Sequence, residues 1–246
     1  MSPNLRSKTH YSEILLIFLF LGGDKISKTC YNRCKTRKVK LKMKALIING
    51  SPHRNGTTKR ALLEIKKVLE VEDFECEIYD LEPGIVGCLA CGYCKREGRC
   101  VTNDGVNRLA ELFAEADALV VGSPVYYASP NGSLISLLDR LFFSTSFDKR
   151  MKVGAAVVAA RRGGLTAAFD VLNKYFSISG MPIATSRYWN QIHGNSALEA
   201  EDDLEGLATM RELAKNIAFL VRSIKAEKDL HGLPKREERV STNFIR

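Results

Sequence analysis

The densest chemistry in the sequence is a group of four cysteines within thirteen residues, Cys88, Cys91, Cys94 and Cys100. Two gaps of two residues and one of five allow a single short loop to wrap its thiolates around one metal centre. Four such thiolates suit a [4Fe–4S] cluster. Structural zinc is the main alternative, and a redox disulfide or unliganded thiols are a third. Zinc sites usually use two CxxC pairs on separate knuckles, so the third cysteine at the same short spacing favours iron and sulfur.

A second group of residues, between Asn49 and Thr58, is suited to bind a phosphate. Small and hydroxyl side chains stand between an apolar run and an amphipathic stretch, as in a loop that opens a helix, where free N–H groups attract anions. The loop matches neither the GxxxxGK[ST] nor the GxGxxG pattern. It therefore suits a terminal monophosphate held without a metal. The alternative is a simple capped turn, with Asn55 or Thr57 as the N-cap.

Two further loops suit a flat aromatic ligand such as a flavin ring. In the string GSPVYYASPNG, Tyr126 or Tyr127 can stack on the ring. In the string ARRGG, Gly163 and Gly164 let backbone amides approach it, and Arg161 can stabilise negative charge on the reduced ring. Each loop alone also fits an ordinary strand end or turn. Together, at the ends of successive expected strands, they indicate one binding site.

These strings resemble those of the NADPH-dependent FMN reductase and iron–sulfur flavoprotein families. GSPHRNGTT is similar to their GSPRxxGNT phosphate loop, SPVY and RRGG are similar to their flavin loops, and the compact cysteine spacing is also similar. His53 stands where the families often have arginine, with Arg54 beside it. The resemblance implies that FMN is bound by Ser51, His53, Asn55, Gly56, Thr57, Thr58, Pro124, Val125, Tyr126, Tyr127, Arg161, Gly163 and Gly164. It implies that an iron–sulfur cluster is bound by Cys88, Cys91, Cys94 and Cys100.

The resemblance covers residues 44 to about 228 and implies a flavodoxin-like fold. It also implies a ferredoxin-type electron donor and a homo-oligomer, a dimer or tetramer, in which the cluster and flavin of adjacent subunits approach one another. Tyr188–Gly194 resembles a further motif of these families, but the sequence offers no physical role for it. Trp189 could equally lie in the core and His193 on the surface, so neither is predicted to be catalytic, and no other catalytic residue is predicted.

Alternating apolar and amphipathic stretches must position these loops. Strands are expected at 45–49, 75–81, 118–122, 153–160 and 183–185. Helices are expected at 57–71, 106–115, 134–143, 165–177 and 204 to about 228, with loop throughout 83–104. Most of the strands are too apolar to face water, which predicts an α/β fold with a doubly wound, five-stranded parallel sheet and a Cys-rich loop after the second strand. Such sheets bind ligands at the carboxyl ends of their strands.

The net charge of +9 is concentrated at the N-terminus, because residues 1–42 hold ten Lys or Arg and two Asp or Glu. The rest of the chain is nearly neutral, so neither a nucleic-acid partner nor a membrane partner is predicted. Ile14–Leu21 is apolar but too short to span a bilayer. Residues 1–42 are predicted to be an extension before a natural start at Met43, and a targeting or anchoring segment is the alternative.

The remaining organisation is predicted as an FMN-binding domain at 43–228, with its cysteine loop at 84–104, and a polar tail at 229–246. Clustered cysteines indicate a reducing compartment, the cytoplasm. The favoured function is an FMN-dependent oxidoreductase in which a cluster exchanges electrons with FMN. A cluster-free reductase using NAD(P)H as substrate, acting on FMN or a quinone, is the first alternative. A metal-stabilised redox sensor without turnover is the second.

Overall fold

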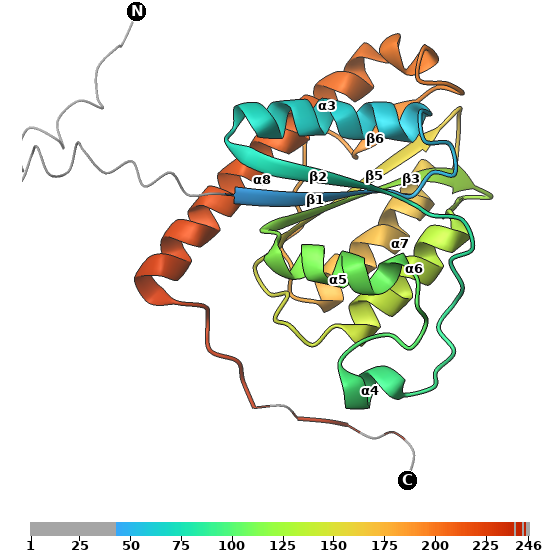
Figure 1. Ribbon diagram of the computed structural model, residues 1–246. Helices are drawn as coiled ribbons and strands as arrows, with labels where there is room; N and C mark the ends of the chain where they lie inside the picture. Colours follow the sequence, from blue (N-terminus) through green and yellow to red (C-terminus); the bar gives the residue numbers. More distant parts are fainter. Residues whose placement is uncertain (1–42, 239, 243, 245–246) are drawn as a thin grey trace, which may run out of the picture. The chain divides into compact units, whose positions relative to one another are not determined.

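The computed structural model describes residues 43–238, 240–242 and 244, so the predicted extension at 1–42 lies outside the described part of the chain (Figure 1). The strands are β1 (Met43–Asn49), β2 (Phe74–Asp80), β3 (Ala118–Tyr126), β4 (Ser129–Pro130), β5 (Val153–Ala160) and β6 (Gln191–His193). The helices are α3 (Thr57–Val71), α4 (Tyr93–Glu97), α5 (Gly105–Glu115), α6 (Gly132–Ser144), α7 (Leu165–Ile178) and α8 (Leu204–His231), with a 3-10 turn η1 (Glu199–Glu201). None of the described helices is long and apolar enough to cross a membrane.

The strands form one sheet in the order β2-β1-β3-β5-β6, in which every neighbouring pair is parallel. Only the short β4 is antiparallel, against the end of β3. The chain runs from β1 outward to β2 and then returns to β3 on the other side of β1. This reversal of strand order creates a crevice at the carboxyl ends of β1 and β3, where doubly wound sheets bind their ligands. The predicted doubly wound sheet is confirmed.

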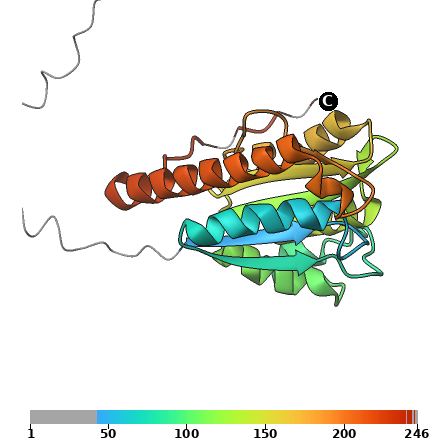
Figure 2. The ribbon, with the colours of Figure 1, turned by 90° about the horizontal axis from the view of Figure 1, so that it is seen from above.

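Helices cover both faces of the sheet, with α3 and α8 on one face and α5, α6 and α7 on the other (Figures 1 and 2). Successive side chains of a strand point to opposite faces. Ile47 therefore packs in the core under α3 and α8, whereas Leu46 and Ile48 pack under α5 and α6. Because both faces are covered, the central strands β1, β3 and β5 are largely apolar throughout, whereas the edge strand β2 is partly polar and exposes Glu75 and Glu77.

Two expectations about the elements are wrong. The predicted strand at 183–185 forms only an isolated bridge between Ile183 and Gly154. The strand that pairs with β5 at this edge of the sheet is instead Gln191–His193. The last backbone hydrogen bond of this segment to β5 is made by the Ala184 N–H. Hydrogen bonding to β5 resumes at the buried Asn190, whose side chain donates to the Ala156 carbonyl at 3.0 Å. In addition, the stretch expected to be all loop contains α4, which lies between two glycines in left-handed conformation.

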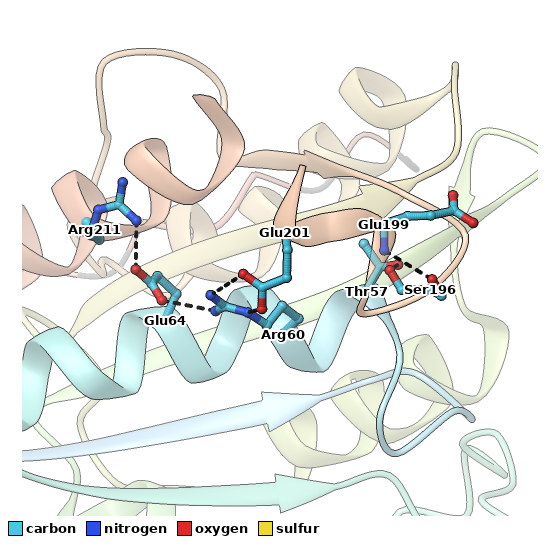
Figure 3. Close-up of polar contacts among 7 residues, drawn as sticks. All are labelled: Thr57, Arg60, Glu64, Ser196, Glu199, Glu201 and Arg211. Carbon is cyan, nitrogen blue, oxygen red and sulfur yellow. Dashed lines mark hydrogen bonds and ion pairs between the residues drawn. The ribbon is translucent and has the colours of Figure 1, made fainter. Parts of the chain in front are cut away.

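A buried carboxylate in the middle of α3 joins this helix to α8 (Figure 3). Glu64 accepts hydrogen bonds from Arg60 at 3.0 Å and from Arg211 of α8 at 2.7 Å, and Arg60 also pairs with Glu201 of η1. Burial by itself would raise the pKa of Glu64, but the two guanidinium groups lower it below the ordinary value. The Glu64 carboxylate therefore stabilises the fold in its ionised form.

We predict that Glu64→Gln lowers the free energy of unfolding by about 1–3 kcal/mol at pH 7, because two charge-assisted hydrogen bonds are weakened in a buried position. A folded-state pKa below the unfolded value means that this stabilisation is present above pH 4.5 and is lost as the pH falls through the folded pKa. Urea unfolding at several pH values should show the two proteins converging in acid. Glu70→Gln, at a half-exposed position of the same helix, is the control, and an equal loss in both variants would contradict the prediction.

Candidate functional site

The loops after β1 and β3 are hydrogen-bonded to each other at the carboxyl edge of the sheet. The Gly50 N–H donates to the Gly122 carbonyl at 2.8 Å, and the Asn131 side chain donates to the Gly50 carbonyl at 2.7 Å. The Asn131 N–H in turn donates to the Ser123 hydroxyl at 3.0 Å. The predicted phosphate loop and the predicted flavin loop therefore form one rigid edge of the crevice.

The phosphate loop leaves the start of α3 open to an anion. Gly56 is the N-cap of α3 and supplies no side chain, so the alternative interpretation, in which Asn55 or Thr57 caps this helix, is wrong. The first N–H groups of a helix without a side-chain cap are free to bind an anion. Ser51 and Thr58 are buried beside this end, and the Ser51 hydroxyl accepts from the His53 N–H at 3.1 Å.

The remaining side chains of this loop differ in how they are placed. His53, Arg54 and Asn55 are exposed, so any of them is free to turn toward a ligand. Thr57 instead lies with its hydroxyl 3.0 Å from both the Gly194 and the Ser196 carbonyls, and Figure 3 shows it beside Ser196. This predicted phosphate ligand thus joins the start of α3 to the loop that follows β6.

The segment Tyr188–Gly194, which had no role from sequence, forms the end of the sheet next to this loop. Asn190 is buried and bonds to β5 through its side chain and its carbonyl, which accepts from Val158 at 3.0 Å. Gly194 has φ +144, a conformation that favours glycine, and a Cβ there would lie 3.0 Å from the Ala200 nitrogen. The segment therefore positions the loop that Thr57 contacts.

Trp189 and His193, for which the sequence predicts no role, both lie at the surface. Trp189 is half exposed and contacts Tyr188, with 5.0 Å between ring centroids, so it is not a core residue. His193 is also partly exposed, and its Nδ1 lies 3.5 Å from the Asp203 carboxylate at the start of α8.

The loops after β3 and β5 touch at Gly164. Gly164 has φ +89, and a Cβ at this position would lie 3.0 Å from the Ala128 Cα and 3.2 Å from a Val125 methyl. Tyr127 and Ala128 also adopt positive φ, which is uncommon for residues with a side chain. Tyr126 is about half exposed beside them and is free to cover a planar ligand.

The other predicted flavin residues lie around this contact. Pro124 and Val125 are partly buried at the end of β3, whereas Arg161 and Gly163 are exposed after β5. The structure thus gathers the three predicted loops at one edge of the sheet, as the doubly wound topology requires.

The four predicted metal ligands line one small pocket between the Cys-rich loop and α6. Cys88 and Cys91 are exposed, and Cys94 and Cys100 are partly buried. The loop reaches this shape through positive φ at Ala90, Gly92 and Gly98. Among the described residues, no three His, Cys, Asp or Glu side chains converge closely enough to ligate a metal ion. The thiols therefore share a pocket of suitable donor chemistry without forming a closed ligand sphere.

The most buried polar side chain of this pocket is Arg140 of α6, which belongs to none of the sequence motifs. Its side chain is 2% exposed and pairs with both oxygens of Asp104, at 2.6 and 2.8 Å. It also donates to the Val86 carbonyl at 3.2 Å, and its Nε donates to the Cys100 sulfur at 3.3 Å. One guanidinium group thus binds the Cys-rich loop near its start at Val86, at its end at Asp104, and at its fourth cysteine, Cys100.

A signal for Arg140 was present in the sequence. It lies at the border of the apolar side of an expected helix, one turn after Leu137, and an arginine that is buried there requires a partner. What the sequence does not give is the partner, because Asp104 is thirty-six residues away along the chain.

The same guanidinium favours the ionised forms of its neighbours. Burial alone would raise the pKa of the Cys100 thiol, but hydrogen bonds from Arg140 and from the Thr102 backbone lower it below the ordinary value. The pKa of Asp104 is lowered in the same way. Cys76 in β2, outside the pocket, shows the opposite case, since burial raises its pKa to about 12. Metals bind thiolates, so Cys100 is chemically prepared to act as a ligand.

The cysteine pocket and the flavin loops lie at opposite ends of α6. Asn131, the N-cap of α6, contacts the phosphate loop, whereas Arg140 and Phe143 line the cysteine pocket. A rise of 1.5 Å per residue places Phe143 about 18 Å from Asn131 along the helix axis.

Comparison with known proteins agrees with this arrangement. The family model described as NADPH-dependent FMN reductase matches residues 43–195. An iron–sulfur flavoprotein of Methanocaldococcus jannaschii is 32% identical over 192 residues, which are 74% of this chain and 100% of that protein. An archaeal flavodoxin superposes with a TM-score of 0.51 at 19% identity over 73% of this chain and 99% of its own. RosB with bound 8-demethyl-8-formylriboflavin-5'-phosphate superposes with a TM-score of 0.57 at 17% identity, over 83% and 94%.

The two structural matches show the flavodoxin-like fold, and the two sequence matches show the family. The matched region begins at Met43, the first residue of β1, and includes the phosphate loop, the flavin loops and the cysteine loop. The chain belongs to the family of NADPH-dependent FMN reductases and iron–sulfur flavoproteins, and it is an FMN-dependent oxidoreductase.

Proposed function

We propose that this oxidoreductase exchanges single electrons between a [4Fe–4S] cluster in the cysteine pocket and FMN at the carboxyl edge of the sheet. The observation that carries the proposal is the lining of one pocket by Cys88, Cys91, Cys94 and Cys100, with Arg140 buried behind them. When bound, the cluster supplies one-electron steps and the flavin couples them to two-electron chemistry.

For the phosphate of FMN, the proposed seat is the start of α3. Its uncapped N–H groups and helix dipole face the loop, and the buried Ser51 and Thr58 hydroxyls add hydrogen bonds. His53 and Asn55 are exposed beside them and are proposed to close over the phosphate. Thr57 takes part through its backbone, because its hydroxyl is bonded to the loop after β6.

For the ring of FMN, the proposed walls are the loops that touch at Gly164. Tyr126 and Tyr127 lie on one loop and are exposed enough to stack on the ring. Gly163 has open space where a Cβ would lie, so its backbone can approach the ring edge. Arg161 carries a positive charge at the same edge, which favours the anionic reduced flavin.

The cysteines supply the thiolate donors that a cubane requires, and the left-handed Gly92 and Gly98 allow the loop to curve around it. A zinc ion would use the same donors. A cluster-free, NAD(P)H-dependent reductase is the second candidate, and it is favoured by the match of residues 43–195 to the family model described as NADPH-dependent FMN reductase. Counting iron and zinc in the purified protein distinguishes an iron–sulfur cluster, a zinc site and a cluster-free reductase.

We propose a homo-oligomer in which the cluster of one copy lies near the flavin of another. Leu89 and Phe143 beside the pocket are 70% and 61% exposed, which is unusual apolar exposure around a redox centre. A ferredoxin-type protein is the proposed electron donor, and the thiol chemistry suits the reducing cytoplasm.

For anaerobically purified protein, we predict four irons, four acid-labile sulfides and one FMN per chain. Cys94→Ser should remove the iron and leave FMN bound, because the flavin loops do not touch the cysteine pocket. Cys76→Ala is the matched control and should keep both, since Cys76 lies outside the pocket. Zinc in place of iron, or FMN without any metal in the wild type, would overturn the cluster proposal.

The contact at Gly164 gives a separate prediction for the flavin site. Gly164→Ala should weaken FMN binding at least tenfold, because the new methyl meets the Ala128 backbone and φ +89 is unfavourable for alanine. Gly132→Ala adds a methyl in open space at the start of α6 and should change the affinity less than twofold. Titration of FMN into apoprotein, followed by flavin fluorescence, measures both. Equal affinity in all three proteins would mean that this contact does not shape the flavin site.

A further inference from the structure

We propose that Arg140 is a positioning residue that sets the reduction potential of the cluster through its hydrogen bond to the Cys100 sulfur. The inference rests on the proposed function, because it requires a cluster in the pocket. It concerns a residue of α6 that lies outside the cysteine motif and that supplies no ligand.

The geometry leaves little freedom for this side chain. Asp104 engages the two terminal nitrogens of the guanidinium group, and the Val86 carbonyl accepts from one of them as well. The third nitrogen of the guanidinium group, Nε, donates to the Cys100 sulfur at 3.3 Å. Since Arg140 is 2% exposed, water does not compete for these bonds.

Hydrogen bonds and nearby charges are the means by which proteins tune iron–sulfur potentials. Reduction adds one electron to the cluster and its thiolates, so a buried N–H donor stabilises the reduced state more than the oxidised state. Arg140 therefore raises the potential. Asp104 acts in the opposite direction, because its carboxylate cancels most of the positive charge of the guanidinium group.

These opposite signs distinguish electrostatic tuning from simple support of the loop. Arg140→Gln removes the donor and the cation, and it should lower the potential. Asp104→Asn keeps the cap on α5, since asparagine is a good N-cap, but leaves the cation uncompensated, and it should raise the potential. If the pair only held the loop in place, both substitutions would loosen it and shift the potential in the same direction.

The test is an anaerobic redox titration of wild type, Arg140→Gln, Arg140→Lys and Asp104→Asn, followed by the spectrum of the reduced cluster, with iron counted in each sample. Arg140→Gln should change the ratio of reduced to oxidised cluster about tenfold at a given solution potential, equal to a fall of about 59 mV. Arg140→Lys keeps the charge but loses the Nε donor, so it should lie between Gln and wild type.

The outcomes separate this inference from the proposal beneath it. A fall in Arg140→Gln together with a rise in Asp104→Asn supports the inference, and the rise alone supports it if Arg140→Gln does not fold. An unchanged potential in an iron-loaded Arg140→Gln protein, or shifts of the same sign in both variants, would overturn the inference alone. Iron-free wild-type protein would overturn the proposed function and this inference with it.

Discussion

The ion pair between Arg140 and Asp104 is the interaction on which the cysteine side of this protein depends. Burying two charges is unfavourable unless their hydrogen-bonding groups are satisfied. Here Asp104 accepts from Arg140 and caps α5 through the Val106 N–H, while Arg140 also reaches Val86 and Cys100. A loop with little core of its own is thereby attached at both ends to α5 and α6, and its cysteines are held over one pocket.

Helix α6 links this pocket to the flavin side. Its first turn is tied to the phosphate loop through Asn131, and its last turns line the cysteine pocket. The same helix buries Leu134, Leu137, Leu138 and Leu141 against the sheet. Its position is therefore determined by the main core, which fixes the cysteine pocket relative to the phosphate loop.

Much of this structure follows from local sequence pattern. The expected helix at Thr57–Val71 and strand at Val153–Ala160 have the same bounds in the structure, because their apolar periodicity and buried faces are unambiguous. The last strand was misplaced because Ile183–Thr185 is as apolar as a strand, whereas Gln191–His193 is recognisable only through the bonds that Asn190 makes to β5. Loop positions could be read from motifs, but the partners of Arg140 and Thr57 are distant in sequence and depend on the tertiary fold.

The most direct test of this account is a crystal structure of the anaerobically prepared protein, with anomalous scattering measured on both sides of the iron edge. We expect an iron signal in the pocket lined by Cys88, Cys91, Cys94 and Cys100, with the Arg140 Nε in hydrogen-bonding contact with the Cys100 sulfur and the pair to Asp104 intact. A pocket without iron signal, or iron bound while Arg140 is turned away from Cys100, would contradict it.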